Sequence, residues 1–204
     1  MLPASMNSCG CHSEQGATDA ERRVLRIALA LNAAMFIIGV IAGIVAQSTS
    51  LIADALDMLG DASAYTIALV AVGRSARFKA GAASVSGSVL LVLGLGVLIE
   101  VVRRVLFGSA PESLVMIGVA CVSLAVNATV LRMLGRFREG EVHLRATWIF
   151  TRVDVIANVG VIASGLLVFF TGSRYPDLVV GTAIGIYVIK EAFEILGEAR
   201  EARA

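Results

Sequence analysis

Four aspartates and one asparagine lie inside apolar stretches of the chain, where polar side chains are uncommon. Asp54, Asp57 and Asp61 fall in one stretch, and Asp154 and Asn158 fall in another. Carboxylate and amide oxygens spaced four residues apart on two facing helices form the inward-projecting metal sites that helical bundles build. These residues therefore point to the binding of a divalent cation. A proton-sharing carboxyl cluster and a polar seam between helices are the alternatives.

Helical geometry brings these side chains together. At roughly 100° per residue, Asp54, Asp57 and Asp61 fall within an arc of about 60° on one helix. The same arithmetic places Asp154 and Asn158 on one face of the second helix. Asp54 lies closest to the outer end of its stretch, so it could be either a ligand or a hydrated residue at the mouth of the site.

The composition places these acids in a membrane. The chain has 204 residues, of which 57% are hydrophobic and 16% are charged, and its mean hydropathy is +0.84. A helix needs roughly 20 apolar residues to cross the hydrocarbon core, where only helices or closed barrels satisfy the backbone. Six such stretches, without the alternating pattern of barrel strands, predict an all-α integral membrane protein with a six-transmembrane-helix bundle. They cover residues 24–46, 51–73, 85–107, 113–134, 146–170 and 177–197.

The free-energy cost of placing ionised acids in such a bundle must be offset by another interaction. Each ionised aspartate at the centre of a membrane helix costs about 2.5 to 3.5 kcal/mol to insert. Four of them could destabilise the empty bundle by roughly 10 kcal/mol. We therefore expect a cation, bound protons or a partner group at this place.

Basic residues are concentrated at one end of the predicted helices, and by the positive-inside rule that end is cytoplasmic. Both termini are then expected in the cytoplasm. The inner set is Arg22, Arg23, Arg26, Arg74, Arg77, Lys79, Arg132, Arg136, Arg138 and Arg145, against Arg103, Arg104 and Arg174 at the opposite end. The net charge of +1 gives no indication of a nucleic-acid partner.

We expect three parts along the chain. Residues 1–20 are predicted to be a flexible cytoplasmic tail, residues 21–197 the membrane domain, and residues 198–204 a short cytoplasmic end with no soluble domain after it. Short loops between the stretches suggest three successive helical hairpins. Gly181 and Gly185 form a small-xxx-small pattern that would suit either a dimer seam or packing within the chain.

The cysteines and histidines give weaker signals. No disulfide is predicted for Cys9, Cys11 and Cys121, because two lie in a cytosolic tail and one lies in a span. Cys9, Cys11 and His12 could hold a soft cation transiently, but they are too few for a closed tetrahedral zinc site. His143 could assist ion entry at the cytosolic mouth, although a solvated loop histidine is the simpler interpretation.

The pattern resembles the cation diffusion facilitator family of divalent-metal/proton antiporters. Six helices with cytoplasmic termini, the acidic pair Asp57 and Asp61, and a second motif ending in Asp154 carry the resemblance, which covers about residues 21–197. The similarity extends to the segments beside both motifs. They read Ser48-Thr49-Ser50-Leu51-Ile52-Ala53-Asp54 and Asp154-Val155-Ile156-Ala157-Asn158-Val159-Gly160-Val161-Ile162.

The resemblance also implies a ligand set. In that family the central site takes His or Asp from two positions, four residues apart, on each of two helices. Asp57, Asp61 and Asp154 match three of these positions, and the fourth falls on Phe150, which cannot coordinate a metal. Oxygen donors without an imidazole favour harder ions such as manganese or iron(II) over zinc. Other donors could complete the shell, namely Asn158, Thr151, Asp54 or water.

The function that the resemblance implies is transport of a divalent metal cation. The ion, one of manganese, iron, cobalt or zinc, would leave the cytoplasm by alternating access in exchange for protons, with no permanently bound cofactor. The resemblance further implies a homodimer in a lipid bilayer, a multi-pass protein of the bacterial inner membrane, and no enzymatic activity.

Two other functions would retain much of this pattern. A transport-inactive homologue could act as a structural or regulatory membrane partner, with Phe150 having disabled the site. A membrane phosphotransferase of the CDP-alcohol type also holds metals with an Asp-x-x-x-Asp pair. Its motif needs Asp-Gly-x-x-Ala-Arg upstream, which is absent here.

Overall fold

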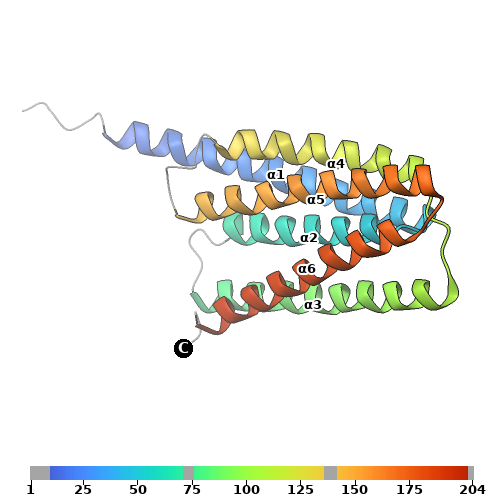
Figure 1. The fold of residues 1–204 in the computed structure, drawn as a ribbon. Helices are drawn as coiled ribbons and strands as arrows, with labels where there is room; N and C mark the ends of the chain where they lie inside the picture. Colours follow the sequence, from blue (N-terminus) through green and yellow to red (C-terminus); the bar gives the residue numbers. More distant parts are fainter. Residues whose placement is uncertain (1–9, 71–75, 136–141, 202–204) are drawn as a thin grey trace, which may run out of the picture.

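The chain folds into six helices in a computed structural model that describes residues 10–70, 76–135 and 142–201. Within these ranges there is no strand, which confirms the predicted all-α class. The first and last described helical residues lie at the same end of the bundle (Figure 1). The helices are α1 (Gly10–Val45), α2 (Thr49–Val70), α3 (Ala76–Phe107), α4 (Ser113–Leu134), α5 (Val142–Thr171) and α6 (Tyr175–Glu201).

Four of the described helices are long and apolar enough to cross a membrane. They are α1, α3, α4 and α5, over Asp19–Val45, Ala80–Phe107, Ser113–Leu134 and Thr151–Thr171. The other two, α2 and α6, lie beside them in the bundle (Figure 1). Their composition is less apolar because α2 carries three aspartates and α6 carries Asp177, Lys190 and Glu191.

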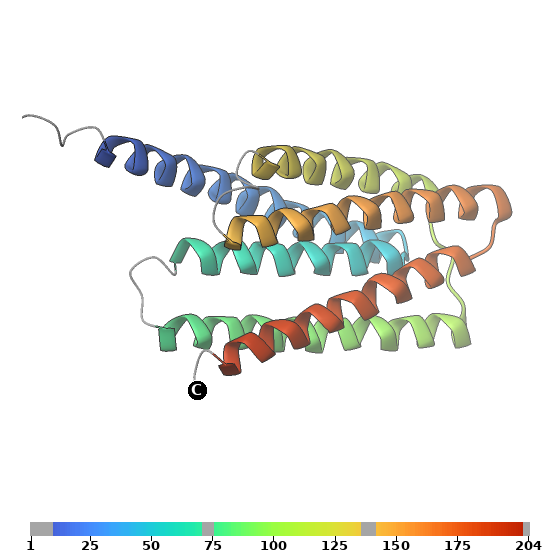
Figure 2. The same cartoon turned by 60° about the vertical axis from the view of Figure 1, so that its left-hand side comes forward.

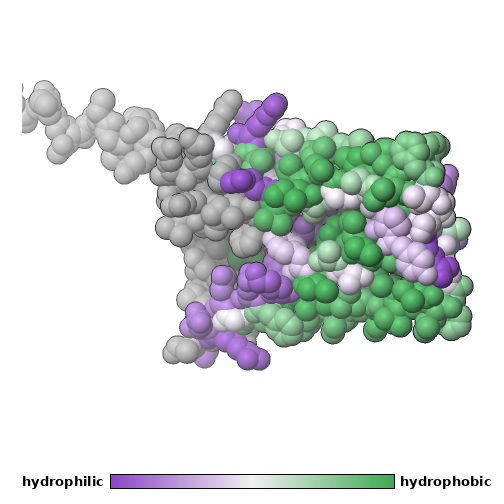
Figure 3. Space-filling model, in the orientation of Figure 1, coloured by the Kyte–Doolittle hydropathy of each residue, from purple (hydrophilic) through white to green (hydrophobic). Residues whose placement is uncertain are grey.

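The outer surface of the bundle is apolar, as expected for a multi-pass membrane protein. Ile44, Val92 and Phe170 are 63%, 68% and 78% exposed, which would be costly in water and is favourable in lipid. Figure 3 shows this surface as a broad hydrophobic band on one face. Hydrophilic residues gather toward the end where α3 begins and α6 ends.

Helix α2 is the centre of the bundle and packs against all five other helices. None of the large exposed hydrophobic side chains among the described residues belongs to α2. Its Leu51 and Leu56 join a core with Leu90 of α3, Met116 of α4 and Val188 of α6. The three aspartates of α2 are therefore surrounded by protein and have no lipid-facing side to which they could turn.

Three successive hairpins would pair α1 with α2, α3 with α4, and α5 with α6. The helices pack in a different arrangement. The closest pairs are α1 with α2, α3 with α6, and α4 with α5, and Figures 1 and 2 show α3 lying along α6. Glycines allow this approach, since a Cβ placed on Gly94 of α3 would lie 2.8 Å from Cγ1 of Ile189 on α6. The hairpin prediction is thus wrong for α3 and α4.

The first turn of α2 is held by a carboxylate from α6. Asp177 is fully buried and accepts five hydrogen bonds of 2.6 to 3.1 Å from the backbone N–H groups of Thr49 and Ser50 and from three hydroxyl groups. The hydroxyls belong to Ser48, Thr49 and Ser50. Asp177 also lies in the first turn of α6, so the positive ends of two helices stabilise its charge.

The glycine pair of α6 serves packing within the chain. A Cβ on Gly181 would lie 2.8 Å from the carbonyl carbon of Thr49 and 2.9 Å from the backbone nitrogen of Ser50. A Cβ on Gly185 would lie 3.3 Å from Val97 and Leu98 of α3. Of the two interpretations of this pattern, the structure favours internal packing over a dimer seam.

Helix α1 begins at Gly10, within the segment 1–20 that we expected to lack a helical pattern. The side chains of Cys11 and His12 lie outside the described residues, as does Cys9 altogether, so the hypothesis of a metal-binding tail stays a prediction. The division into a tail, a membrane domain and a short end also stays a prediction.

Replacing Asp177 with alanine should destabilise the protein, because two backbone donors and three hydroxyls would lose a buried charged acceptor. We expect the free energy of unfolding in detergent to fall by about 3 kcal/mol, measured by denaturant titration. Glu112→Ala is the matched control, since Glu112 stands at the N-terminus of α4 without a side-chain cap bond. Equal losses for both variants would contradict the capping role.

Gly181→Ala should lower the melting temperature because the new methyl group has no room against the start of α2. Overpacking of this kind costs about 1 to 3 kcal/mol. Gly96→Ala is the control, because nothing lies within 4 Å of a Cβ at that position of α3. The control should be neutral or slightly stabilising through helix propensity, and a stable Gly181→Ala protein would show that α2 and α6 are not in tight contact.

Candidate metal-binding site

The predicted site residues all lie in the interior of the bundle. Asp54, Asp57 and Asp61 of α2 are 3%, 5% and 7% exposed, and Asp154 and Asn158 of α5 are 6% and 0% exposed. Their burial follows from the central place of α2 and from the helical spacing that puts each set on one face. The structure divides these five residues into two groups.

The first group consists of Asp57, Asp61 and Asp154. The carboxyl group of Asp154 is a neighbour of both α2 carboxyl groups and interacts with them electrostatically. Its Oδ2 atom is buried and has no hydrogen-bond partner among the described residues. The hydroxyl of Tyr65 donates to Oδ2 of Asp61 at 3.3 Å and lies 3.4 Å from Oγ1 of Thr151. An unpaired, buried carboxylate oxygen beside two other acids is a position that a cation would stabilise.

The second group is a chain of polar side chains from three helices. Asn127 of α4 donates from Nδ2 to Oδ1 of Asn158 at 3.0 Å, and Asn158 donates from Nδ2 to Oδ1 of Asp54 at 2.6 Å. Ser123 also contacts Asp54. The side chain of Asn158 is therefore bonded at both ends, which ties α4 to α2 through α5. Asn127 makes the interhelical hydrogen bond typical of a polar residue in a membrane helix.

Sequence reasoning missed one acid that reaches the first group, Glu191 of α6. A Cβ placed on Gly60 would lie 3.4 Å from Oε1 and 3.5 Å from Oε2 of Glu191, and the carboxyl group of Asp57 is an electrostatic neighbour of Glu191. The signal was present in the sequence. Glu191 follows the buried residues Ile184 and Val188 by seven and three positions, so it shares their inward face.

Two residues of the sequence-based argument cannot be placed. The side chains of Phe150 and His143 lie outside the described residues, although both positions belong to α5. The geometry of the fourth family position, and the role suggested for His143 at the mouth, stay predictions.

The acids are neighbours without forming a finished cage. In the described part of the chain, no three His, Cys, Asp or Glu side chains are arranged so that they could already hold a metal ion. A cation bound among the acids would therefore have to draw their carboxyl groups closer together. The recorded ion pairs between described residues lie elsewhere. These pairs join Glu100 to Arg103 and Arg104, and Lys190 to Glu194, at the spacings expected for helix ion pairs.

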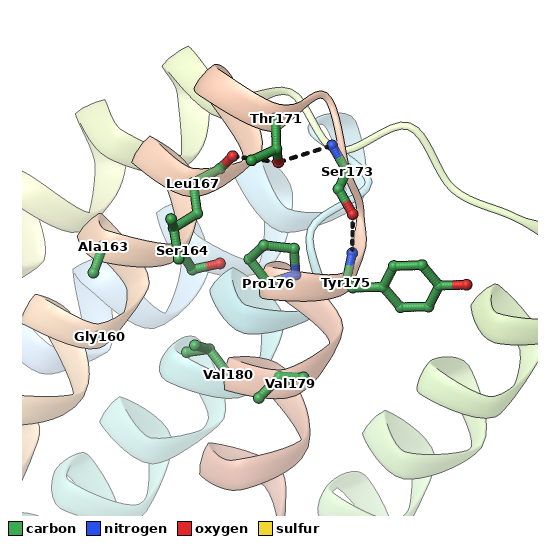
Figure 4. A pocket seen from close by; sticks show the side chains of 10 residues that line it. All are labelled: Gly160, Ala163, Ser164, Leu167, Thr171, Ser173, Tyr175, Pro176, Val179 and Val180. Carbon is green, nitrogen blue, oxygen red and sulfur yellow. Dashed lines mark hydrogen bonds between the residues drawn. The ribbon is translucent and has the colours of Figure 1, made fainter.

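A cavity of about 550 Å³ lies between α5 and α6, near the turn that joins them. Figure 4 shows Leu167, Pro176, Val179 and Val180 around it. Its lining is apolar and includes none of the buried acids. Cations are not stabilised by such walls, so the carboxylate group and not this cavity is the candidate cation site.

Comparison with known proteins places the chain in a family. The family model for the cation efflux transmembrane domain matches residues 25–202. The chain is 30% identical over 186 residues to the metal cation efflux system protein CzcD of Cupriavidus metallidurans, covering 85% of this chain and 59% of that protein. It is 26% identical over 191 residues to the zinc transporter ZitB of Escherichia coli, covering 87% of this chain and 61% of that protein.

A third relative is the cadmium, cobalt and zinc/H(+)-K(+) antiporter of Bacillus subtilis, 24% identical over 192 residues, with 86% of this chain and 61% of that protein covered. The chain thus spans 59% to 61% of the length of these relatives. The matched range of the family model includes Asp54, Asp57, Asp61, Asp154 and Asn158. Since the family model matches most of the chain, the chain belongs to the cation efflux transmembrane domain family, as its resemblance to the cation diffusion facilitators predicted.

Proposed function

We propose that the protein moves a divalent metal cation out of the cytoplasm, and that Asp57, Asp61 and Asp154 bind this cation inside the membrane. One observation carries the proposal. The three carboxyl groups converge in the interior of the bundle, and Oδ2 of Asp154 has no hydrogen-bond partner among the described residues. A doubly charged ion offsets the cost of burying such a group. Membership of the cation efflux family supports the same function.

The second group of polar residues takes a supporting role in this proposal. Asp54 and Asn158 are candidate ligands from the sequence, but each is engaged by the other and by neighbouring side chains. They would hold α2, α4 and α5 in register beside the ion. Direct ligation by either would require the hydrogen bond between them to break.

The chemistry of the donors and the names of the relatives point to different metals. Carboxylate oxygens without an imidazole suit manganese and iron(II), whereas the names of the relatives refer to zinc, cadmium and cobalt. We propose that the transported ion is manganese, iron(II), cobalt or zinc. It is a substrate and not a resident cofactor, and no enzymatic reaction is proposed.

Proton exchange fits the same group of acids. Carboxyl groups must lose their protons to bind a metal, so protons arriving from the opposite side can displace the ion. One relative is named as an antiporter for H(+) and K(+). In the proposed cycle, the site opens to the cytoplasm, takes up the ion, and then opens to the outside, where protons replace it.

The arrangement in the cell is part of this proposal. The basic ends of the helices indicate that both termini lie in the cytoplasm, and the bacterial sources of the relatives suggest the inner membrane. A homodimer follows from the family resemblance. We do not assign its interface to Gly181 and Gly185 of α6, because these glycines are in contact with other helices of the same chain.

A second candidate is a transport-inactive member of the family that serves as a membrane partner of another protein. Two observations favour it. Phe150 stands at the fourth family position in the sequence, and the described acids do not form a finished cage. The two functions differ in what the loss of a buried acid does to metal movement.

Asp154→Asn should abolish metal transport, because the amide removes one negative charge from the site and is a weaker oxygen donor to a metal ion than a carboxylate. We expect metal flux to fall at least about tenfold. The assay uses purified protein in proteoliposomes under an imposed pH gradient, with manganese, iron(II), cobalt, zinc and cadmium offered separately. Glu194→Gln is the control, since Glu194 is exposed on α6 and paired with Lys190.

Reversing or removing the pH gradient should reverse or reduce the flux of the wild-type protein. Equal flux for Asp154→Asn and wild type, at or near the level of empty liposomes, would support the inactive partner instead. A response to zinc alone would show that the donor set does not favour hard ions.

A further inference from the structure

We propose that Glu191 of α6 is a further ligand of the transported cation, completing with Asp57, Asp61 and Asp154 a site of four carboxylates. This inference rests on the proposed function and extends it to a third helix. Asp57 and Asp61 come from α2 and Asp154 comes from α5. With Glu191, the ion would be held by three helices, α2, α5 and α6.

The carboxyl group of Glu191 lies close to Gly60 of α2. Its two carboxyl oxygens lie 3.4 and 3.5 Å from where a Cβ on Gly60 would be, so the carboxyl group rests against the backbone of α2 between two of the acids. The carboxyl group of Asp57 is its electrostatic neighbour. A larger residue at position 60 would press into the space that this carboxyl group occupies.

Among the described residues, no recorded ion pair accounts for the partly buried position of Glu191. Lys190, the adjacent base, is exposed and pairs with Glu194 one turn further along, at 3.4 Å. Among the described residues, the charged groups that act on Glu191 are Asp57 and Asp61 of α2 and Glu194 of its own helix, and Tyr187 is a further titratable neighbour on α6. The surroundings of Glu191 are therefore acidic.

A second observation points to a ligand in the same place. Oδ2 of Asp154 is buried and without a hydrogen-bond partner in the described part of the chain, and its carboxyl group is aimed at Asp57 and Asp61. A cation bound among the four carboxyl groups would explain both observations. It would supply the missing partner of Oδ2 of Asp154, and it would account for the position of Glu191 beside the other acids. Manganese and iron(II) accept such an oxygen-only shell.

Glu191 would also supply what the sequence lacks at the fourth family position. Phe150 offers no donor atom, so the two-helix set is one ligand short. A carboxylate from α6 restores four protein ligands, while the change of type from imidazole to carboxylate favours harder ions. The substrate class that we infer is therefore a hard or borderline divalent cation.

The test is metal affinity, measured by calorimetry on the purified full chain in detergent with manganese, cobalt and zinc chloride. Glu191→Gln keeps the shape of the side chain and removes its charge. We expect its dissociation constant for the preferred metal to rise about tenfold or more, as for Asp154→Asn. Glu194→Gln is the matched control on the next turn of the same helix and should bind like wild type within about twofold.

Thermal unfolding separates a ligand from a structural residue. Without metal, Glu191→Gln should melt no lower than wild type, because it relieves repulsion among neighbouring acids. With metal, the rise in melting temperature should be smaller than for wild type, since a weaker ligand stabilises less. A residue needed only for packing would lower the melting temperature equally in both conditions. The visible absorption of bound cobalt should also change in Glu191→Gln and not in Glu194→Gln.

The outcomes distinguish this inference from the proposed function. If Glu191→Gln binds like wild type while Asp154→Asn does not, the site exists without Glu191 and the inference is wrong, but the transporter proposal stands. If wild-type protein binds none of the metals, both are wrong. Loss of affinity in Glu191→Gln with an unchanged Glu194→Gln supports both.

Discussion

The burial of several carboxyl groups at the centre of an apolar bundle is the constraint on which the rest of the structure depends. An acid on a lipid-facing helix can tilt toward the headgroups, but α2 is enclosed by the five other helices and offers no such exit. Its aspartates must be stabilised from within, by hydrogen bonds, protons or a metal ion. Asp54 accepts a hydrogen bond from Asn158 and Asp61 one from Tyr65, whereas Oδ2 of Asp154 has no partner among the described residues, and we propose that a cation stabilises it.

Much of this could be predicted from the sequence because two physical rules act locally. The thickness of the hydrocarbon core sets the length of each apolar stretch, and each of the six predicted stretches overlaps one described helix, although only α1, α3, α4 and α5 contain a long window with little charge. The helical repeat then puts Asp57 and Asp61 on one face. Neither rule needs knowledge of the partner helices.

The features that sequence reasoning missed depend on which helices are neighbours. Chain order suggested that α3 would pair with α4, but glycines at the α3–α6 contact allow a closer approach between those two helices. Glu191 lies near the acids of α2 only because α6 passes α2 at Gly60, a contact that chain order does not reveal. In the same way, the five predicted ligands separate into two groups because Asn127 of α4 engages Asn158. Such partners cannot be read from the periodicity of a single helix.

The buried cap at Asp177 sets the point about which α6 would rotate relative to α2. The hydrogen bonds at Thr49 and Ser50 fasten the two helices at their starts, and Glu191 stands about 21 Å further along α6 at 1.5 Å per residue. A rotation of only about 5° around that fastening would carry Glu191 through about 2 Å, which is close to the length of a metal–oxygen bond. In the site that we propose, a rotation of this size would therefore make or break the bond between Glu191 and the ion.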